Sequence, residues 1–190
     1  MVPNHRIILS SASPRRKELL SELGIDFSVD TENNFVEKCP ANISPKDVPL
    51  FMAKGKSDGF HRSLEDNEIL LTADTVVIVD DVVLGKPHDK TQAVDMLKKL
   101  SGRAHEVITA VVLRSNYKTI SFSEVTRVFF SEMSEDEINY YIDNYRPFDK
   151  AGAYGIQEWI GLACIEKIDG SYFNVMGLPV HRIHQALKLF

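Results

Sequence analysis

Short apolar runs alternate along the chain with stretches in which apolar residues recur every three or four positions. The first pattern predicts β-strands, and the second predicts amphipathic helices. Strands are expected at residues 7–9, 25–29, 69–79, 82–84, 107–113, 119–130 and about 162–168. Helices are expected to begin after Ser13, Ser44, Asp89 and Ser134 and at about Pro179, and to end before Gly24, near Phe60, before Gly102 and near Asn144.

The order of these elements indicates an α/β protein. Residues 69–79 give the strongest strand signal because they are dense in β-branched side chains. Asp80-Asp81 is expected to turn the chain back as a hairpin, and the two long strands after it suggest a second one. Hairpins among alternating helices and strands favour a mixed sheet flanked by helices. With no linker or internal repeat, residues 1–190 are interpreted as a single domain.

Composition narrows the class of protein. The 190 residues are 44% hydrophobic and 26% charged, as in soluble globular proteins, which excludes disorder and low complexity. No apolar run approaches the roughly 18 residues that cross a bilayer, and no signal peptide is recognisable. Cys39 and Cys164 show no metal or redox spacing and are interpreted as unrelated thiols in a reducing cytosol. We therefore expect a cytoplasmic protein.

The net charge of −5 disfavours a long nucleic-acid surface but permits a local cationic pocket for a small anion. Arg15 and Arg16 follow Ser13-Pro14 at a predicted helix start. There the helix dipole, the unpaired N–H groups and the forked guanidinium donors would all favour a bound phosphate. An equally good explanation from position alone is that both arginines point into water.

Asp74 interrupts the most apolar strand. A carboxylate is costly to bury there, so it should have a partner or a task, such as holding a divalent cation or taking a proton from water. The alternative is a solvated strand end. Lys86, between Gly85 and Pro87, could present a point charge to phosphate, although a surface turn explains it better. Lys54 and Lys56 fit a solvated helix face equally well, and Glu37 is uninformative alone.

The loop at residues 149–157 has the composition of a binding loop. Its small residues permit close backbone approach, Tyr154 could stack on a ligand, and Gln157 could read a base or ribose edge. A plain connecting loop is the alternative. The histidines form no metal-binding spacing, and His181 and His184 are interpreted as ordinary surface residues.

Several motifs occur in one order over nearly the whole chain. They are Ser11-Ala12-Ser13-Pro14-Arg15-Arg16-Lys17-Glu18-Leu19-Leu20, Ala73-Asp74-Thr75, Gly85-Lys86-Pro87, Leu100-Ser101-Gly102, Asp149-Lys150-Ala151-Gly152-Ala153-Tyr154-Gly155-Ile156-Gln157 and Gly170-Ser171-Tyr172. Together they resemble the Maf family of nucleoside triphosphate pyrophosphatases, whose older label is septum-formation inhibitor. The resemblance implies an elongated mixed sheet with two lobes and a central nucleotide cleft, as in inosine triphosphate pyrophosphatases.

The resemblance also implies roles for individual residues. Asp74 matches the catalytic carboxylate that accepts a proton. Substrate choice is implied for Arg15, Thr75 and Gln157, phosphate binding for Ser13, Arg16, Lys56 and Lys86, and a divalent metal, Mg²⁺ or Mn²⁺, for Glu37 and Asp74. One departure from the family pattern is Gly55, where relatives often carry a larger, helix-favouring residue.

The segment at residues 149–157 resembles the branch of the family that acts on dTTP and UTP. Hydrolysis of these nucleotides to the monophosphate and pyrophosphate is therefore expected, whereas the sister branch prefers 7-methyl-GTP and has a different sequence there. Two functions of other classes remain open. One is a nucleotide-binding regulator of cell division without turnover, and the other is a protein-interaction factor of the division machinery. A nucleoside triphosphate is the expected partner; a homodimer is allowed, and neither nucleic acid nor a membrane is expected.

Overall fold

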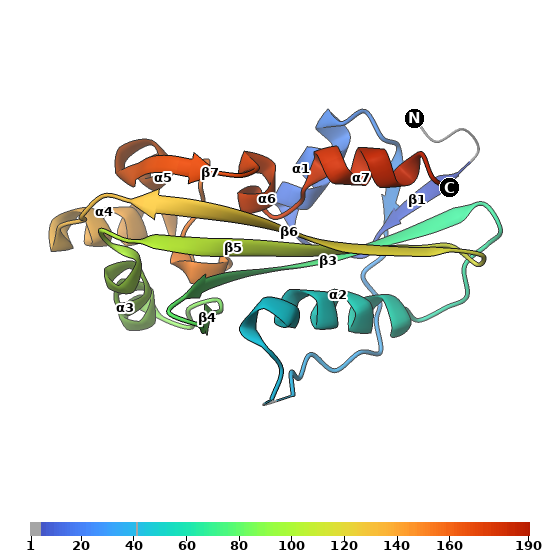
Figure 1. Cartoon of the computed structure of the whole chain (residues 1–190), viewed down its shortest axis with the longest axis horizontal. Coiled ribbons are helices and arrows are strands. Elements are labelled where there is room, and N and C mark those ends of the chain that lie inside the picture. The colour runs from blue at the N-terminus through green and yellow to red at the C-terminus, as the bar shows by residue number, and fades with distance from the viewer. Residues whose placement is uncertain (1–4, 41) are drawn as a thin grey trace. The chain divides into compact units, whose positions relative to one another are not determined.

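A computed structural model describes residues 5–40 and 42–190 of the chain (Figure 1). It contains a sheet flanked by helices, which confirms the α/β class. The strands are β1 (Arg6–Leu9), β2 (Phe27–Val29), β3 (Glu68–Val79), β4 (Val82–Leu84), β5 (Ala104–Arg114), β6 (Thr119–Phe130) and β7 (Ile165–Asp169). The helices are α1 (Pro14–Glu22), α2 (Val48–Asp58), α3 (Lys90–Leu100), α4 (Glu135–Tyr145), α5 (Trp159–Cys164), α6 (Tyr172–Met176) and α7 (Val180–Leu187), with 3₁₀ turns η1 (Pro45–Asp47) and η2 (Ala151–Ala153).

The strands pair in the order β2-β1-β3-β5-β6-β7, and β4 pairs with β3. β1 is parallel to β2 and β3, whereas β4 is antiparallel to β3 and β7 is antiparallel to β6. Asp80 and Asp81 turn the β3–β4 hairpin with φ values of 51° and 58°, the left-handed region that a two-residue type I′ turn requires. Between β5 and β6, the N–H of Ser115 donates to the carbonyl of Lys118 at 2.8 Å. The sheet is therefore mixed, as predicted.

The chain divides into two compact units. Unit 1 contains the chain up to Asp74, Thr109–Glu124 and Gly177–Phe190, and unit 2 contains Thr75–Ile108 and Val125–Met176. β3, β5 and β6 each contribute residues to both units. The single domain expected over residues 1–190 stays a prediction.

In unit 1, α2 lies on one face of the strands, and α1 and α7 lie on the other (Figure 1). Ala53 of α2 is fully buried against β5. The hydroxyl of Thr72, buried in β3, donates to the carbonyl of Ala53 at 2.7 Å. Arg114 of β5 donates to the carbonyl of Ser57 at 2.6 Å. These contacts fix the rotation of α2 about its axis, and so the direction of its other side chains.

Unit 2 has a large apolar core shared by α3, α4, α5 and the strands of that unit. The side chain of Asp89 accepts the N–H of Gln92 at 2.8 Å and caps α3. Ser134 and Glu137 form the capping box of α4, in which each side chain accepts the other residue's backbone N–H. The helix starts after Asp89 and Ser134 were predicted from the sequence and are confirmed.

Three local elements differ from expectation. The serine–proline signal at Ser44 opens η1, and α2 begins only at Val48. Residues 162–164 belong to α5, so the strand expected from residue 162 is wrong there and β7 begins at Ile165. Ile160 and Cys164 are buried four residues apart on one side of α5. An apolar run this short fits the periodicity of a helix as well as that of a strand, so the sequence pattern does not distinguish them. The five residues of α6 were not expected as a helix, since they are too few to display a helical period.

Neither cysteine forms a disulfide. Cys39 is half-buried, and Cys164 is buried in unit 2, where burial raises the pKa of its thiol. Within residues 5–40 and 42–190, no helix has both the length and the apolar character needed to cross a membrane.

Candidate active site

Asp74 interrupts the apolar sequence of β3 and is the last residue of that strand in unit 1. Residues 68–73 are all buried, and the side chain of Asp74 is 18% exposed. Its Oδ1 accepts a hydrogen bond from Nζ of Lys56 at 2.7 Å. Of the partner or task predicted for this carboxylate, the structure shows a partner, Lys56.

Lys56 joins two carboxylates. Its ammonium extends from α2 and lies 2.7 Å from Oδ1 of Asp74 and 3.3 Å from Oε1 of Glu37. Asp74 and Lys56 are mostly buried, whereas Glu37 is 59% exposed. Three residues predicted as site residues, from three separate segments, are thus brought together in unit 1. The sequence left Lys56 and Glu37 ambiguous because neither is distinctive before α2 is placed against β3.

Arg16 lies in the first turn of α1 and connects three segments of unit 1. Its Nε donates to the carbonyl of Gly177 at 2.9 Å, and its Nη1 donates to the carbonyl of Ala73 at 2.9 Å and to the Ser11 hydroxyl at 3.3 Å. Burial lowers the pKa of the Arg16 guanidinium, and the charge of Asp74 acts in the opposite direction. Arg16 therefore holds the backbone beside Asp74 and supplies a fixed positive charge there.

The remaining predicted residues of unit 1 lie at the start of α1. Ser13 occupies the N-cap position with extended backbone, as expected, but its hydroxyl makes no capping hydrogen bond. Its N–H donates instead to the hydroxyl of Ser11 at 3.3 Å. Arg15 is half-buried, and its charge helps to lower the pKa of Arg16. The roles of Ser13 and Arg15 toward a ligand stay predictions.

Thr75, Lys86 and Gln157 belong to unit 2. Thr75 follows Asp74 in β3 and is half-buried, whereas Lys86 and Gln157 are exposed. The N–H of Gly152 donates to the carbonyl of Gly85 at 3.0 Å, so the turn that carries Lys86 is tied to the loop that carries Gln157. This bond links two motifs that the sequence could only place separately.

A polar cluster missed by the sequence interpretation holds that loop. Lys150, 9% exposed at its side chain, lies 3.1 Å from Oε1 of Glu158, and the hydroxyl of Tyr141 forms a short hydrogen bond to the same carboxylate. The Tyr141 hydroxyl also accepts the N–H of Gly155 at 3.0 Å. Burial, and secondly Glu158, raise the pKa of the Tyr141 hydroxyl. A Cβ at position 155 would lie 2.9 Å from the Glu158 carboxyl carbon, so a larger residue there would displace the end of that side chain.

The expectation that Tyr154 could stack on a ligand is wrong. Its ring is buried, with centroids 5.0 Å from Phe130 and 5.4 Å from His105. Its hydroxyl lies 2.8 Å from Nε2 of His105, and burial lowers the pKa of that histidine to about 4. Tyr154 is a core residue that anchors the loop. Its burial could not be predicted from the local sequence, in which it is simply an aromatic residue next to a glycine.

Asp74 and Glu37 are the candidate metal ligands. Both offer carboxylate oxygens, the hard donors that Mg²⁺ and Mn²⁺ prefer. Within the described part of the chain, no group of three or more His, Cys, Asp and Glu side chains is arranged to hold a metal. Mg²⁺ is commonly bound by one or two carboxylates, with substrate phosphates completing its shell. The two carboxylates around Lys56 fit a metal that arrives with a nucleotide, rather than an all-protein cage.

Comparison with known proteins gives matches along nearly the full chain. Residues 6–190 match the family of Maf-like proteins. A dTTP/UTP pyrophosphatase of Porphyromonas gingivalis is 48% identical over 188 residues, covering 98% of this chain and 94% of the relative. Proteins with the same name from Phocaeicola vulgatus and Christiangramia forsetii are 50% and 46% identical over 184 and 189 residues. These cover 97% and 99% of this chain and 95% of each relative.

A solved structure of a HAM1 protein from Coxiella burnetii has a weaker likeness. Its TM-score is 0.43 at 14% sequence identity, over 68% of this chain and 74% of that protein. This likeness is too low to support an inference about this chain.

Proposed function

The chain belongs to the family of Maf-like proteins, and from this premise we propose that it hydrolyses dTTP and UTP to the nucleoside monophosphate and pyrophosphate. Relatives near half identity over almost their whole length carry that activity in their names. The observation in this chain that carries the proposal is the ammonium of Lys56 held by Asp74 and Glu37. Asp74 can take a proton from water, and the Lys56 ammonium beside it can bind phosphate oxygens; hydrolysis of a phosphoanhydride needs both functions.

In the proposed reaction, a water oxygen attacks the α-phosphorus, and the bond from that phosphorus to the α,β-bridging oxygen breaks. The bridging oxygen leaves with pyrophosphate. Asp74 accepts the proton from the attacking water. Before the nucleotide binds, Oδ1 of Asp74 is occupied by Lys56 at 2.7 Å. The phosphates draw the Lys56 ammonium toward themselves, which releases Oδ1 to accept the proton.

Positive charges stabilise the leaving pyrophosphate in this proposal. This role is assigned to Arg16, Lys56 and Lys86, the basic residues that match the family's phosphate-binding positions. The orientation of Arg16 is fixed by two backbone carbonyls, so it offers charge without a large loss of side-chain entropy on binding. Ser13 supplements phosphate binding at the start of α1, where the helix dipole favours an anion.

Substrate choice is assigned to Arg15, Thr75 and Gln157. Gln157 is exposed at the end of a rigidly held loop, and an amide can both donate to and accept from a pyrimidine edge. Glu37 and Asp74 would hold Mg²⁺ or Mn²⁺ brought by the nucleotide. When bound, this ion would polarise phosphate oxygens and neutralise developing charge.

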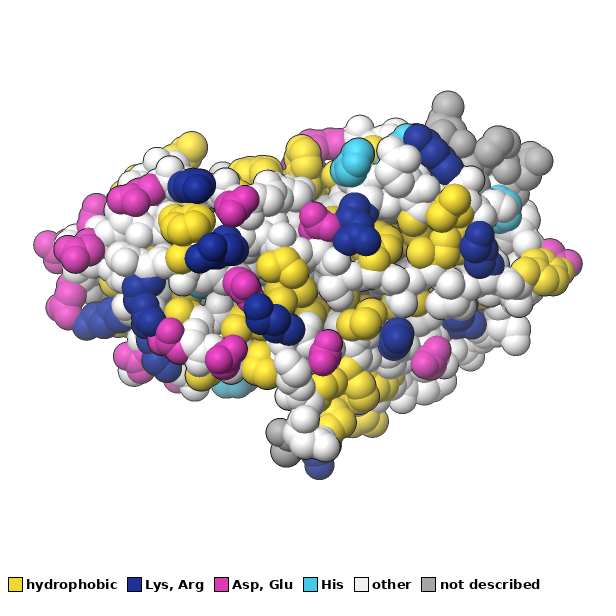
Figure 2. Space-filling view, viewed as in Figure 1, with side chains coloured by type: hydrophobic (Ala, Val, Ile, Leu, Met, Phe, Trp, Pro, Cys, Tyr) yellow, Lys and Arg dark blue, Asp and Glu magenta, His cyan; other side chains and the backbone are white. Residues whose placement is uncertain are grey.

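We also propose that the protein is located in the cytoplasm and acts on free nucleotides. The proposed function is compatible with a homodimer. On the face drawn in Figure 2, Lys and Arg side chains are interspersed with Asp and Glu side chains. Such mixing does not favour a long polyanion on that face. Sedimentation of the purified protein at several concentrations would measure the oligomeric state.

Pyrophosphate release from a panel of nucleotides tests the proposed function. UTP, dTTP, 7-methyl-GTP and GTP are each incubated with the protein and Mg²⁺, and the products are separated. We expect pyrophosphate with UMP or dTMP, at higher kcat/KM than for either guanine nucleotide. A preference for 7-methyl-GTP would move the chain to the sister branch. Binding without turnover would favour the regulator, and release of single phosphate would contradict the reaction.

A further inference from the structure

Gly55 of α2 and Gly59, the C-cap residue directly after the helix, allow another segment to lie on the C-terminal end of α2. Gly55 and Gly59 are four residues apart, so they share a helix face. A Cβ at Gly55 would lie 2.3 Å from the ring of Phe35, and one at Gly59 would lie 2.7 Å from the backbone nitrogen of Phe35. Glycine is a poor helix former, and the close approach of the Phe35 ring explains why it occupies position 55 inside α2. At the C-cap, Gly59 leaves room for the backbone of Phe35.

Hydrogen bonds fix the segment at residues 33–35 on this face. The N–H of Asn34 donates to the carbonyl of Gly59 at 2.7 Å. The side-chain amide of Asn33 donates to the carbonyl of Lys56 at 2.6 Å, and its Oδ1 accepts the N–H of Phe35 at 2.8 Å. The Phe35 ring also meets Phe51 edge-on, at 6.2 Å between centroids. One asparagine therefore both shapes the segment and ties it to the main chain of Lys56.

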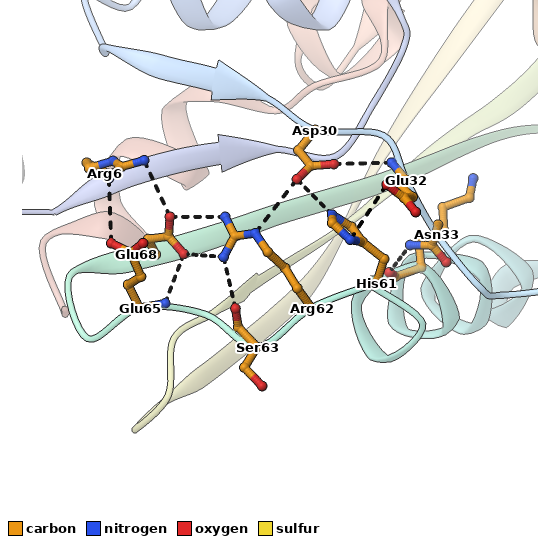
Figure 3. Close-up of polar contacts among 10 residues, drawn as sticks. Arg6, Asp30, Glu32, Asn33, His61, Arg62, Ser63, Glu65 and Glu68 are labelled. Atoms are coloured by element: carbon orange, nitrogen blue, oxygen red, sulfur yellow. Dashed lines mark hydrogen bonds and ion pairs between the residues drawn. The ribbon is translucent and has the colours of Figure 1, made fainter.

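A polar network holds the chain just before this segment (Figure 3). Oδ2 of Asp30 lies 2.9 Å from Nε2 of His61 and 3.9 Å from Nε of Arg62. Arg62 donates two bonds, at 2.8 and 3.1 Å, to the fully buried carboxylate of Glu68. The hydrogen bond from His61 lowers the pKa of the Asp30 carboxyl. The chain after β2 is thereby anchored to the connection between α2 and β3.

Glu37 follows Phe35 by two residues. It is 59% exposed, and its carboxylate reaches the Lys56 ammonium at 3.3 Å. Residues 33–37 thus contact Lys56 at both ends, with Asn33 bonded to its carbonyl and Glu37 beside its ammonium. A short tether from a docked ring limits where an exposed carboxylate can go, whereas an undocked segment would let it move into solvent.

We propose that Asn33 and Phe35 are positioning residues, which hold Glu37 beside Lys56 by docking the segment at residues 33–35 onto Gly55 and Gly59. The consequence for catalysis rests on the proposed function. The docking itself does not depend on that function, so the two can be tested apart.

Thermal melts of the full chain test the docking. Gly55→Ala is made with Phe35 present and again with Phe35→Ala. With Phe35 present, the added methyl collides with the ring, and we expect Tm to fall by about 4 °C or more. Without the ring, alanine is the better helix former and Tm should rise relative to Phe35→Ala alone. The same sign of change in both backgrounds would overturn the docking.

A double-mutant cycle tests the positioning. We expect Asn33→Ala to lower kcat for UTP by about 10–100-fold with little change in KM, because it misplaces Glu37. In a Glu37→Gln background, Asn33→Ala should have almost no further effect. If Asn33→Ala lowers kcat by the same factor in the Glu37→Gln background as in wild type, Asn33 has a merely structural role and the proposal is overturned. Asn34→Ala is the matched control, since that residue docks through its backbone N–H and should keep wild-type kcat.

An NMR measurement separates this proposal from the proposed function. The ¹⁵N resonance of Lys56 Nζ is followed without nucleotide. We expect Asn33→Ala and Glu37→Gln to shift it in the same direction, because each removes the Glu37 carboxylate from the ammonium. If Asn33→Ala leaves the resonance unmoved while Glu37→Gln shifts it, the positioning is overturned even in an active enzyme. If no nucleotide releases pyrophosphate but both variants shift the resonance, the proposed function fails and the positioning stands.

Discussion

A single ammonium shared by two carboxylates leaves one net negative charge in the cluster of Lys56, Asp74 and Glu37. A nucleotide triphosphate approaching this cluster is attracted by Lys56 and repelled by both acids. In the proposed reaction, this balance changes when Lys56 turns to the phosphates, because Asp74 then has an unoccupied oxygen beside a buried strand. Burial on the β3 side excludes bulk water, so the few charges present act more strongly than they would in solvent.

Asp74→Asn tests the proton-accepting role. It retains the size of the side chain and removes its charge. We expect kcat for UTP to fall by about 10²–10⁴-fold, the usual loss for a general base. Binding of the nucleotide in the absence of divalent ions should be kept or tightened, because one repulsive charge is gone. Pyrophosphate release and nucleotide titration measure the two effects.

Asp81→Asn is the matched control for that variant. It makes the same chemical change at the turn that ends β3, where the residue is exposed and its φ of 58° suits asparagine. Wild-type kcat is expected. If Asp74→Asn also keeps near-wild-type kcat, Asp74 is not the catalytic carboxylate, and Glu37 becomes the first alternative.

His105 gives a pH prediction that is independent of activity. Burial lowers its pKa from 6.5 to about 4, so the unfolded chain binds a proton between those values and the folded chain does not. The free energy of unfolding should therefore fall as pH decreases from about 6.5 to about 4, by about 1.4 kcal/mol per pH unit from this residue. Above pH 7 the contribution is constant.

Urea unfolding of wild type and His105→Gln at several pH values measures this effect. Glutamine does not titrate, and its amide can still bond the Tyr154 hydroxyl. The difference in unfolding free energy between the two proteins should change by about 3 kcal/mol over the window, with wild type losing stability toward low pH. A difference that stays constant from pH 7 to pH 4 would mean that His105 titrates alike in both states.

At the scale of elements, hydrogen bonds from α4 hold the loop at residues 149–157 and the residue after it, Glu158. Tyr141 bonds both the Glu158 carboxylate and the N–H of Gly155, in the stretch that carries Gln157. Tyr141→Phe removes one oxygen and leaves both partners without that bond. We expect a loss of about 1–3 kcal/mol in unfolding free energy. We also expect a smaller ratio of kcat/KM for UTP over GTP, because Gln157 is held less firmly.

Tyr140→Phe is the control for that variant, since Tyr140 lies in the same helix and is 49% exposed. In urea unfolding and in kinetics on UTP and GTP, we expect Tyr140→Phe to behave like wild type. If Tyr141→Phe loses stability but keeps the wild-type nucleotide ratio, the cluster supports the fold and not substrate choice.

Local signals explain which elements the sequence could predict. Asp89 and Ser134 cap their helices through side chains a few residues away, and Asp80-Asp81 turns a hairpin by its own backbone preference. Such features are encoded within one turn of chain and were predicted correctly. In contrast, α5 and α6 are too short to display a period.

The site was only partly predictable for a related reason. Asp74 was found because a charge in an apolar strand is anomalous by itself. The pairing of Lys56 with Asp74 and Glu37 depends on how α2 is rotated on β5, which Ala53 and Ser57 decide through tertiary contacts. The burial of Tyr154 likewise depends on distant residues. Neither contact leaves a pattern in the local sequence.

At the scale of the whole molecule, a chain with net charge −5 must bind a strongly anionic substrate. The long-range field of such a protein repels nucleotides, so binding depends on local cations and on the counterion that accompanies the phosphates. Lys56 is already neutralised by its two acids. In the proposed function, this charge distribution would favour a metal-bound nucleotide over the free one, because Asp74 and Glu37 would then be ligands of the ion and no longer repel the phosphates.

Metal removal tests this last point. The protein and UTP are stripped of divalent ions and assayed in excess EDTA, and Mg²⁺ or Mn²⁺ is then restored. We expect pyrophosphate release to fall by about 10²-fold or more and to recover on addition, since the ion stabilises charge that the protein alone does not balance. The melting temperature without nucleotide should not change, because the described residues offer no group of three metal-binding side chains to hold a structural ion. Glu37→Gln should raise the Mg²⁺ concentration that gives half-maximal rate, whereas an effect of metal on the nucleotide alone would leave that concentration unaltered. Full turnover in EDTA would contradict the metal requirement while leaving Asp74 as the proton acceptor.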